Sequence, residues 1–392
     1  MTLFLLEPDQ PGPAWAPFAG VRPIAELRAG IWRIRERWEG ALRMDTSAIL
    51  GGPAEGFSEG DEPATRPAGP IEGPAVVVSS TFAPSGTAVE VTPGTRRLEH
   101  EGRTVGWIVE RGETWSEPHA EGTAAPIDGL ALKGTYDLLT ALEHFLSPDC
   151  ADFLAAGDQD PIADGSIVLG DPHDVICRGA MVEPGVVFDV RNGAIVLEAG
   201  VEVRNGTRLE GPLYAGPHTR LLGGYIRASV FGPWCVARGE IAASVFTGFA
   251  NKGHDGFVGH SILGHWVNLG AGTTTSNLKN TYGEVRLSVA ENSFPTGRTF
   301  LGSLIGDHAK TAIGTMLATG TVVGAGANVF GMTAPKYIPP FAWGAGTTEV
   351  LDEEGFLKIA ARVMPRRQVE FTEARRESLR KTYRRVRQGE AR

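Results

Sequence analysis

The sequence has few cysteines and no long run of apolar residues. Its three cysteines, Cys150, Cys177 and Cys235, are odd in number and widely spaced, which argues against a disulfide framework and a CxxC metal motif. We expect them to be small buried side chains. No stretch reaches the roughly 18 apolar residues that span a bilayer, and MTLFLLEPDQ at the start lacks the basic flank of a signal peptide. The sequence therefore predicts a cytoplasmic protein without a membrane partner.

Positive charge is scarce outside the C-terminal region. The net charge is −9, but residues 351–392 hold 12 Lys and Arg against 7 Asp and Glu, a charge of +5, which leaves −14 on residues 1–350. This acidic body argues against a nucleic-acid partner. Apolar residues recur at helical spacing on both sides of Pro365, and glutamates alternate with the arginines. Residues 350–392 are therefore predicted to form a basic helical tail that packs on the protein's own acidic surface.

The length of 392 residues, 42% of them hydrophobic, is enough for two or three domains. Residues 1–165 mix apolar runs with a Pro- and Gly-rich segment at 51–73 and have no internal repeat. The stretch IAELRAGIWRIRERWEGAL, residues 24–42, has the spacing of a helix. Residues 1–165 are therefore predicted to form a separate α/β domain.

A six-residue repeat distinguishes the second half of the chain. Its aliphatic or small members include Leu197, Val203, Leu209, Ala215 and Leu221, then Leu263 and Leu269, then Ile305, Thr311, Leu317, Val323 and Val329. A second inward position follows each of these four residues later. It is mostly small or aliphatic, and Tyr225 is the large exception. A period of six fits neither a helix nor a simple strand. It is typical of a three-sided coil in which three hexapeptides make a turn of about 18 residues. The sequence predicts such a parallel β-helix over 170–345, with a loop at 278–299 where the repeat is missing.

Residues 254–277 add polar residues at defined spacing to this repeat. His254, Phe257 and Gly259 are followed by Asn268, by GAGT at 270–273 and by Asn277. This resembles the motif H-x-x-Y-x-G and N-x-G-A-G-T-x-x-x-N of the bifunctional N-acetylglucosamine-1-phosphate uridyltransferase/glucosamine-1-phosphate N-acetyltransferase family. The resemblance implies a left-handed β-helix, acetyl-CoA as acyl donor, an amino-sugar phosphate as acceptor, and a place in UDP-N-acetylglucosamine biosynthesis.

Acetyl transfer to an amine needs a base that removes a proton as the nitrogen attacks the thioester. By the resemblance, His254 is this base, Asn268 and Asn277 hydrogen-bond the sugar, and Arg238 contacts the sugar phosphate. Two other basic residues compete for the phosphate, Arg220 and Lys252.

The motif also departs from the family pattern. Phe257 stands in place of a tyrosine, which predicts altered contacts with the sugar, and Ile313 stands in place of a serine near the coenzyme. Ala271 is retained, and the resemblance implies that its backbone amide is free for the pantetheine arm of the coenzyme.

The opening region shows a second resemblance. Residues 17–39, PFAGVRPIAELRAGIWRIRERWE, are similar to the later half of a nucleotidyltransferase signature of the form P-L-T-x-x-R-P-K. A divergent nucleotidyltransferase-like domain is implied, with Arg22 as a phosphate contact and with a nucleoside triphosphate and Mg²⁺ if it is active. The glycine-rich half of the signature is missing, and Ile24 replaces its lysine, so activity of this domain stays open.

Two other functions, and one assembly, follow from the same features. His254, His260 and His265 raise the alternative of a zinc β-helix enzyme of the carbonic anhydrase type, although ligands from one chain need a spacing near 18 residues. The departures at Phe257 and Ile24 raise the alternative of a non-catalytic trimeric scaffold. The flat faces of a triangular coil, and the family's sites between subunits, predict a homotrimer.

Overall fold

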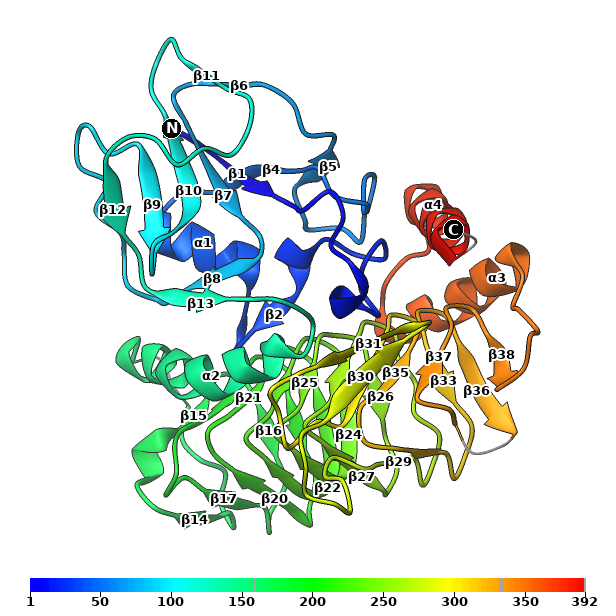
Figure 1. Cartoon of the computed structure of the whole chain (residues 1–392). Helices are drawn as coiled ribbons and strands as arrows, with labels where there is room; N and C mark the ends of the chain where they lie inside the picture. Colours follow the sequence, from blue (N-terminus) through cyan, green and yellow to red (C-terminus); the bar gives the residue numbers. More distant parts are fainter. Residues whose placement is uncertain (158–159, 332–333, 391–392) are drawn as a thin grey trace. The chain divides into compact units, whose positions relative to one another are not determined.

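The computed structural model describes residues 1–157, 160–331 and 334–390 (Figure 1). Contacts between residues divide the chain into two compact units. The first consists of Met1–Trp15, Ala19–Gly134 and Thr372–Arg392, and the second of Ala16–Phe18 and Thr135–Phe371. The first unit ends at Gly134, whereas the sequence predicted a domain boundary near residue 165. The two differ because helix α2 (Asp137–Ala155) clusters with the second unit.

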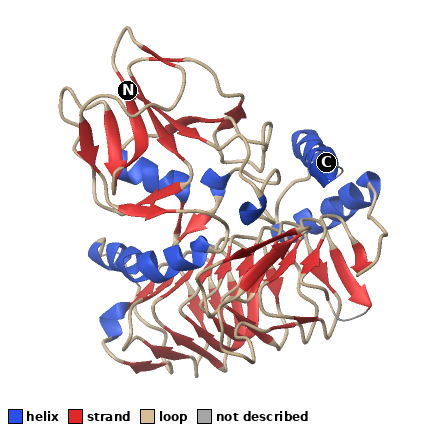
Figure 2. Cartoon of the chain, in the orientation of Figure 1, coloured by secondary structure: helices blue, strands red, loops and turns tan. Residues whose placement is uncertain are grey.

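The first unit is built on a mixed β-sheet, coloured red in Figure 2. Its strand order is β12-β9-β10-β7-β1-β4-β5, in which β1 is parallel to β4 and β7 while β10 is antiparallel to β7. The bounds are β1 (Thr2–Leu6), β4 (Thr46–Leu50), β5 (Ala64–Arg66), β7 (Ala75–Ser79), β9 (Arg97–His100), β10 (Arg103–Val109) and β12 (Ala124–Pro126). Short pairs add β6 (Ile71–Glu72) with β11 (Thr114–Trp115) and β8 (Phe82–Pro84) with β13 (Gly129–Ala131). The predicted α/β domain is confirmed.

The single helix predicted over residues 24–42 is wrong in its first half. The segment forms η2 (Ile24–Glu26), strands β2 (Arg28–Ala29) and β3 (Trp32–Arg33), and only then α1 (Ile34–Leu42). Gly30, at φ 74°, makes the turn between the two strands. The buried Glu26 pairs with Arg35 at 2.6 Å, a tertiary contact that the helical spacing could not reveal. Trp38 of α1 is fully buried.

The second unit is a parallel β-helix, as the six-residue repeat predicted. One face is the sheet β15 (Val175–Cys177), β18 (Ile195–Leu197), β21 (Leu213–Ala215), β23 (Val230–Phe231), β25 (Val245–Phe246), β28 (Ile262–Leu263), β32 (Ser303–Ile305), β35 (Thr321–Val323) and β37 (Tyr337–Ile338), with parallel neighbours. The other faces contain β14 (Ile167–Leu169), β16 (Met181–Val182), β17 (Val187–Asp189), β19 (Glu202–Val203), β20 (Thr207–Glu210), β22 (Arg220–Arg227), β24 (Val236–Ala242), β26 (Asn251–Lys252), β27 (Phe257–Gly259), β29 (Thr274–Thr275), β33 (Lys310–Thr311), β34 (Met316–Leu317), β36 (Asn328–Gly331) and β38 (Trp343–Ala345).

The repeat residues form the continuous core of this coil. Leu197, Leu209 and Leu263 are fully buried, and Leu317 is 2% exposed. Tyr225, which the repeat placed inward, is an exception: its hydroxyl donates a hydrogen bond to Glu210 on the outside, and Ile226 is buried instead. The pairing of β22 with β24 shifts register between Leu221 and Gly224, which moves the frame by one residue and turns Tyr225 outward.

The interruption at residues 278–299 contains an antiparallel hairpin, β30 (Arg286–Val289) with β31 (Asn292–Pro295). Arg298, just beyond it, donates a hydrogen bond of 2.8 Å to Thr140 on α2 and pairs with Glu143. The Cys150 thiol of α2 donates in turn to the Leu213 carbonyl of the coil. All three cysteines are buried, as predicted.

The basic tail forms two helices that belong to different units. Helix α3 (Glu353–Val363) and η4 (Met364–Arg367) cluster with the coil, where Phe356 meets the rings of His308 and Phe341. Helix α4 (Glu373–Glu390) clusters with the first unit, and Arg385 donates to the Gly20 carbonyl at 2.8 Å. No helix within the described residues is both long enough and apolar enough to cross a bilayer.

Candidate functional site

His254 is exposed at the corner between β26 and β27. The corner is held from inside by Lys252, whose side chain is fully buried in the coil. The Lys252 ammonium donates to the carbonyl oxygens of His254, of Asp255 at 3.0 Å and of Arg238 at 3.4 Å. Burial lowers the pKa of Lys252 to about 8, and the charge of Asp255 opposes this shift. A lysine in this position therefore organises a turn rather than meeting a ligand.

The structure brings Arg238 and Ala271 to the same corner as His254. Arg238 is ion-paired with the exposed Asp255 at 3.0 Å. On the next coil, the Gly272 N–H donates to the Asp255 carbonyl at 3.0 Å, which stacks the GAG turn on the His254 turn. Within the described residues, the Ala271 N–H makes no hydrogen bond. Ile313, one coil further, is 80% exposed.

Asn268 lies on an adjoining face rather than at the corner. It is bridged to Asn251 on one side and to Lys310 on the other, and the Asn251 amide donates to its side-chain oxygen at 2.7 Å. The side chain lines a cavity of about 420 Å³. Part of the lining comes from α3 and η4, a contribution that the repeat could not predict.

Phe257 and Asn277 converge elsewhere, over Gly259. A Cβ atom at Gly259 would lie 2.5 Å from Phe257 Cζ and 2.7 Å from Asn277 Nδ2, so a larger residue there would displace these two side chains. Asn277 also donates to Nδ1 of His260 at 2.8 Å, and His260 stacks on Phe300. Burial, and then the charge of Arg298, lower the pKa of His260 to about 4. Sequence reasoning did not join His260 with these two residues, although its separation of 17 residues from Asn277, about one turn of the coil, was a signal that could have done so.

The three histidines occupy three different places around the coil. His254 precedes β27, His260 follows it, and His265 follows β28, where its ring meets Phe249. They do not converge within one chain. Across residues 1–157, 160–331 and 334–390, no group of three or more His, Cys, Asp or Glu is arranged to hold a metal ion.

In the first unit, Arg22 is 3% exposed, pairs with Glu59 at 2.8 Å and lies over the ring of Phe57. Its guanidinium is thus engaged within the protein.

Glu7, a residue that the sequence did not single out, follows β1, and its carboxylate accepts the N–H groups of Ile24 and Ala25, each at 2.9 Å. Burial raises the pKa of Glu7 to about 7. Glu7 therefore takes up two backbone donors at the carboxyl end of the parallel strands, the edge at which α/β sheets bind ligands.

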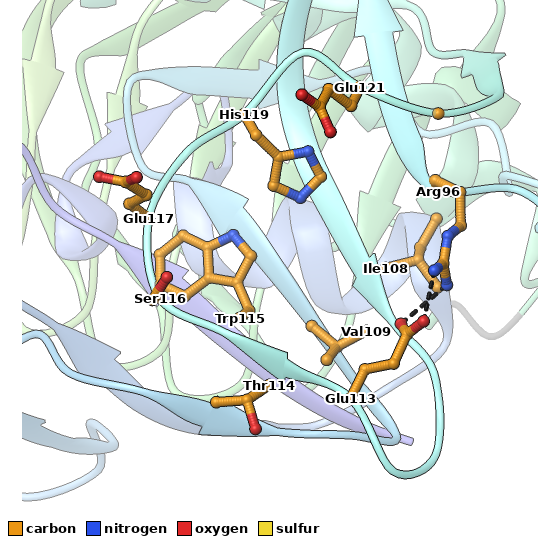
Figure 3. Close-up of a pocket in the computed structure, with 11 residues that line it drawn as sticks. Arg96, Ile108, Val109, Glu113, Thr114, Trp115, Ser116, Glu117, His119 and Glu121 are labelled. Atoms are coloured by element: carbon orange, nitrogen blue, oxygen red, sulfur yellow. Dashed lines mark hydrogen bonds and ion pairs between the residues drawn. The ribbon is translucent and has the colours of Figure 1, made fainter.

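A larger cavity of about 750 Å³ lies at the opposite edge of this sheet (Figure 3). The cavity lies beside the C-terminal end of β10, where Val109 pairs with Ala75 at the start of β7. Arg96 pairs there with Glu113, and Glu117 and Glu121 add negative charge. This excess of carboxylates does not suit a phosphate ligand.

Comparison with known proteins assigns a family model to the N-terminal part of the chain. Residues 5–150 match the model of the family described as Sugar nucleotidyl transferase. The first unit is therefore a nucleotidyltransferase-like domain, as its resemblance implied.

Two curated relatives are described as bifunctional in their names. A bifunctional sugar-1-phosphate nucleotidylyltransferase/acetyltransferase of Sulfurisphaera tokodaii is 31% identical over 151 residues, 35% of either chain. A bifunctional protein GlmU of Jannaschia sp. is 26% identical over 246 residues, 60% of this chain and 48% of the relative. The matches thus span about a third to a half of the relatives' lengths. They confirm the resemblance to bifunctional sugar nucleotidyltransferase/acetyltransferase proteins, and the Sulfurisphaera tokodaii relative is a transferase by name.

Proposed function

We propose that the β-helix transfers an acyl group, acetyl from acetyl-CoA, to the amine of an amino-sugar phosphate. The observation that carries this proposal is the corner at which the exposed His254 lies beside Arg238 and below the free Ala271 N–H. A base, a cation for phosphate and a free amide donor are the groups that this reaction needs. The word acetyltransferase in the name of the Sulfurisphaera tokodaii relative supports the same chemistry.

In this mechanism, His254 removes a proton from the amine as the nitrogen attacks the thioester carbonyl. The new C–N bond forms, the C–S bond breaks, and the coenzyme leaves as a thiol after taking a proton. The sugar phosphate competes with Asp255 for Arg238, since a dianion interacts more strongly with a guanidinium than one exposed carboxylate does.

Asn268 and the pair Phe257–Asn277 lie on faces other than the His254 corner, so one chain does not gather all the residues that the resemblance implies. We therefore propose that the complete site forms between subunits of a homotrimer. For the first unit, we propose binding of a nucleoside triphosphate with Mg²⁺ at the edge near Glu7, in a reaction that yields a nucleotide sugar of the UDP-N-acetylglucosamine type.

The acyl transfer is tested by incubating the full chain with acetyl-CoA and a panel of amino-sugar phosphates while following free thiol. Thiol release that depends on the acceptor, together with an acetylated product, is the expected result. A reaction without acceptor controls for hydrolysis. Absence of acceptor-dependent release across the panel would favour a non-catalytic scaffold.

A further inference from the structure

The cavity of about 420 Å³ beside Asn268 lies between one face of the coil and the segment α3–η4, all within the second unit. Asn251, Asn268 and Lys310 come from stacked positions of the coil and form one side. Phe249 and Trp266, with rings stacked 4.3 Å apart, line it as well. Such a volume is in the range of small-molecule sites.

Four cationic side chains line this cavity: Lys310, Arg362, Arg366 and Arg367. No Asp or Glu is among its lining residues in the described part of the chain. Arg362 and Arg366 are exposed and have no carboxylate partner among the described residues. The cavity therefore has a concentrated, uncompensated positive charge.

Among the described residues, the two more buried cations donate hydrogen bonds only to carbonyl oxygens. Lys310 donates to the His308 carbonyl at 3.0 Å, and burial lowers the pKa of Lys310 to about 8. Arg367 donates to the Trp234 carbonyl at 3.1 Å. Burial, and then the neighbouring charges of Arg220 and Arg366, lower the pKa of Arg367. Each of these charges would be stabilised by an anion in the cavity.

We propose that this cavity binds the phosphate or diphosphate group of a small molecule through Lys310, Arg362, Arg366 and Arg367. Guanidinium groups match phosphate oxygens in pairs, and the amides of Asn251 and Asn268 lie beside them for hydroxyl groups of the same ligand. Because Asn268 also belongs to the proposed acyltransferase site, the inference rests in part on that function. The phosphate site differs from the proposed acyltransferase site in that it includes cations from α3 and η4, the segment after the coil.

Calorimetric titration of the full chain with pyrophosphate, without acetyl-CoA, tests the site. The double variant Arg362→Gln/Arg366→Gln should bind at least about tenfold more weakly, because each lost charged hydrogen bond is worth about a factor of ten or more. Lys310→Met should weaken binding as well. Arg204→Gln is the matched control, since Arg204 is an exposed arginine of the same coil that pairs with Glu183 outside the cavity.

Titration with a sugar 1-phosphate and with a nucleoside diphosphate separates the sources of the phosphate, and the tighter ligand identifies the source. Absence of binding to all three probes, or equal weakening by the control variant, would overturn the proposal. Thiol release distinguishes the two proposals: a chain that releases thiol but binds no phosphate refutes only the phosphate site, whereas one that binds phosphate but releases no thiol refutes only the acyltransferase.

Discussion

At the scale of single residues, His254 and His260 are six positions apart but differ in surroundings. His254 is exposed beside Arg238, while His260 is half-buried, accepts a hydrogen bond from Asn277 and has a pKa near 4. A group with so low a pKa is a weak base at neutral pH. The structure thus favours His254 for proton removal and gives His260 a role in holding Asn277.

His254→Ala should therefore lower kcat for acyl transfer by roughly 10²- to 10⁴-fold, the usual contribution of a general base. His260→Ala should lower kcat much less and act mainly on the KM for the sugar phosphate, because His260 holds Asn277, a proposed sugar contact. Steady-state thiol release measures both, and circular dichroism checks that each variant is folded. Equal losses in the two variants would remove the assignment of His254.

Lys252 provides a prediction about pH and stability. Its pKa is lowered from 10.5 to about 8 in the folded chain, so between these values the unfolded state binds more protons than the folded one. Stability should therefore rise with pH across this window, by about 1.4 kcal/mol per unit of pKa difference at most. Denaturant unfolding from pH 7.5 to 10.5 should show a smaller rise in Lys252→Met than in the parent, because Lys310, whose pKa is also lowered to about 8, contributes to the rise in both proteins. Parallel curves for the two proteins would contradict the burial of a charged lysine.

At the scale of elements, one corner of the coil is built from large residues in a left-handed conformation. These residues have φ between 55° and 63°: His218, Trp234, Phe249, Trp266, His308 and Phe341. Such backbone conformations cost about 1 kcal/mol or more each outside glycine. Stacked rings, such as His218 on Trp234 at 4.4 Å, and contact with Phe356 of α3 offset this cost.

Strand β34 tests the frame of the coil, because its two residues point in opposite directions. Leu317 is 2% exposed, and Met316 is 67% exposed. Leu317→Asp should lower the free energy of unfolding by about 4 kcal/mol or more, since it places an unpaired charge in an apolar core. Met316→Asp is the control and should leave the circular dichroism spectrum and thermal midpoint nearly unchanged. A folded Leu317→Asp variant would show that the frame is wrong.

At the scale of the whole molecule, the exposed apolar side chains of the last coils bear on assembly. Ile313 is 80% exposed and Phe330 40%, and Phe330 contacts the ring of Trp343, itself 39% exposed. Apolar groups this exposed commonly mark protein interfaces.

We expect a homotrimer, and sedimentation velocity at micromolar concentration should show it. Ile313→Asp/Phe330→Asp should shift the population toward monomer and reduce acyl transfer, because the proposed site needs residues from more than one chain. A monomeric parent protein with full activity would contradict both the trimer and the shared site.

The β-helix was predictable from the sequence, because every sixth residue must be apolar to fill a narrow core, and this constraint is local and repeated. The buried cysteines and the helices on either side of Pro365 follow from equally local patterns. His254 and Ala271 lie within one motif, so their shared corner follows from a local pattern as well, whereas Arg238 lies outside that motif.

The partners of polar residues were decided only by tertiary structure. Coils of unequal length and the hairpin after Asn277 bring Lys310 next to Asn268 across 42 positions. Packing of α3 and η4 on the coil then places Arg366 at the same cavity. A repeat determines which side chains face inward, but which outward side chains meet depends on non-local packing. This is why the contacts of Lys252 and His260, and the cationic cavity, emerged only from the folded chain.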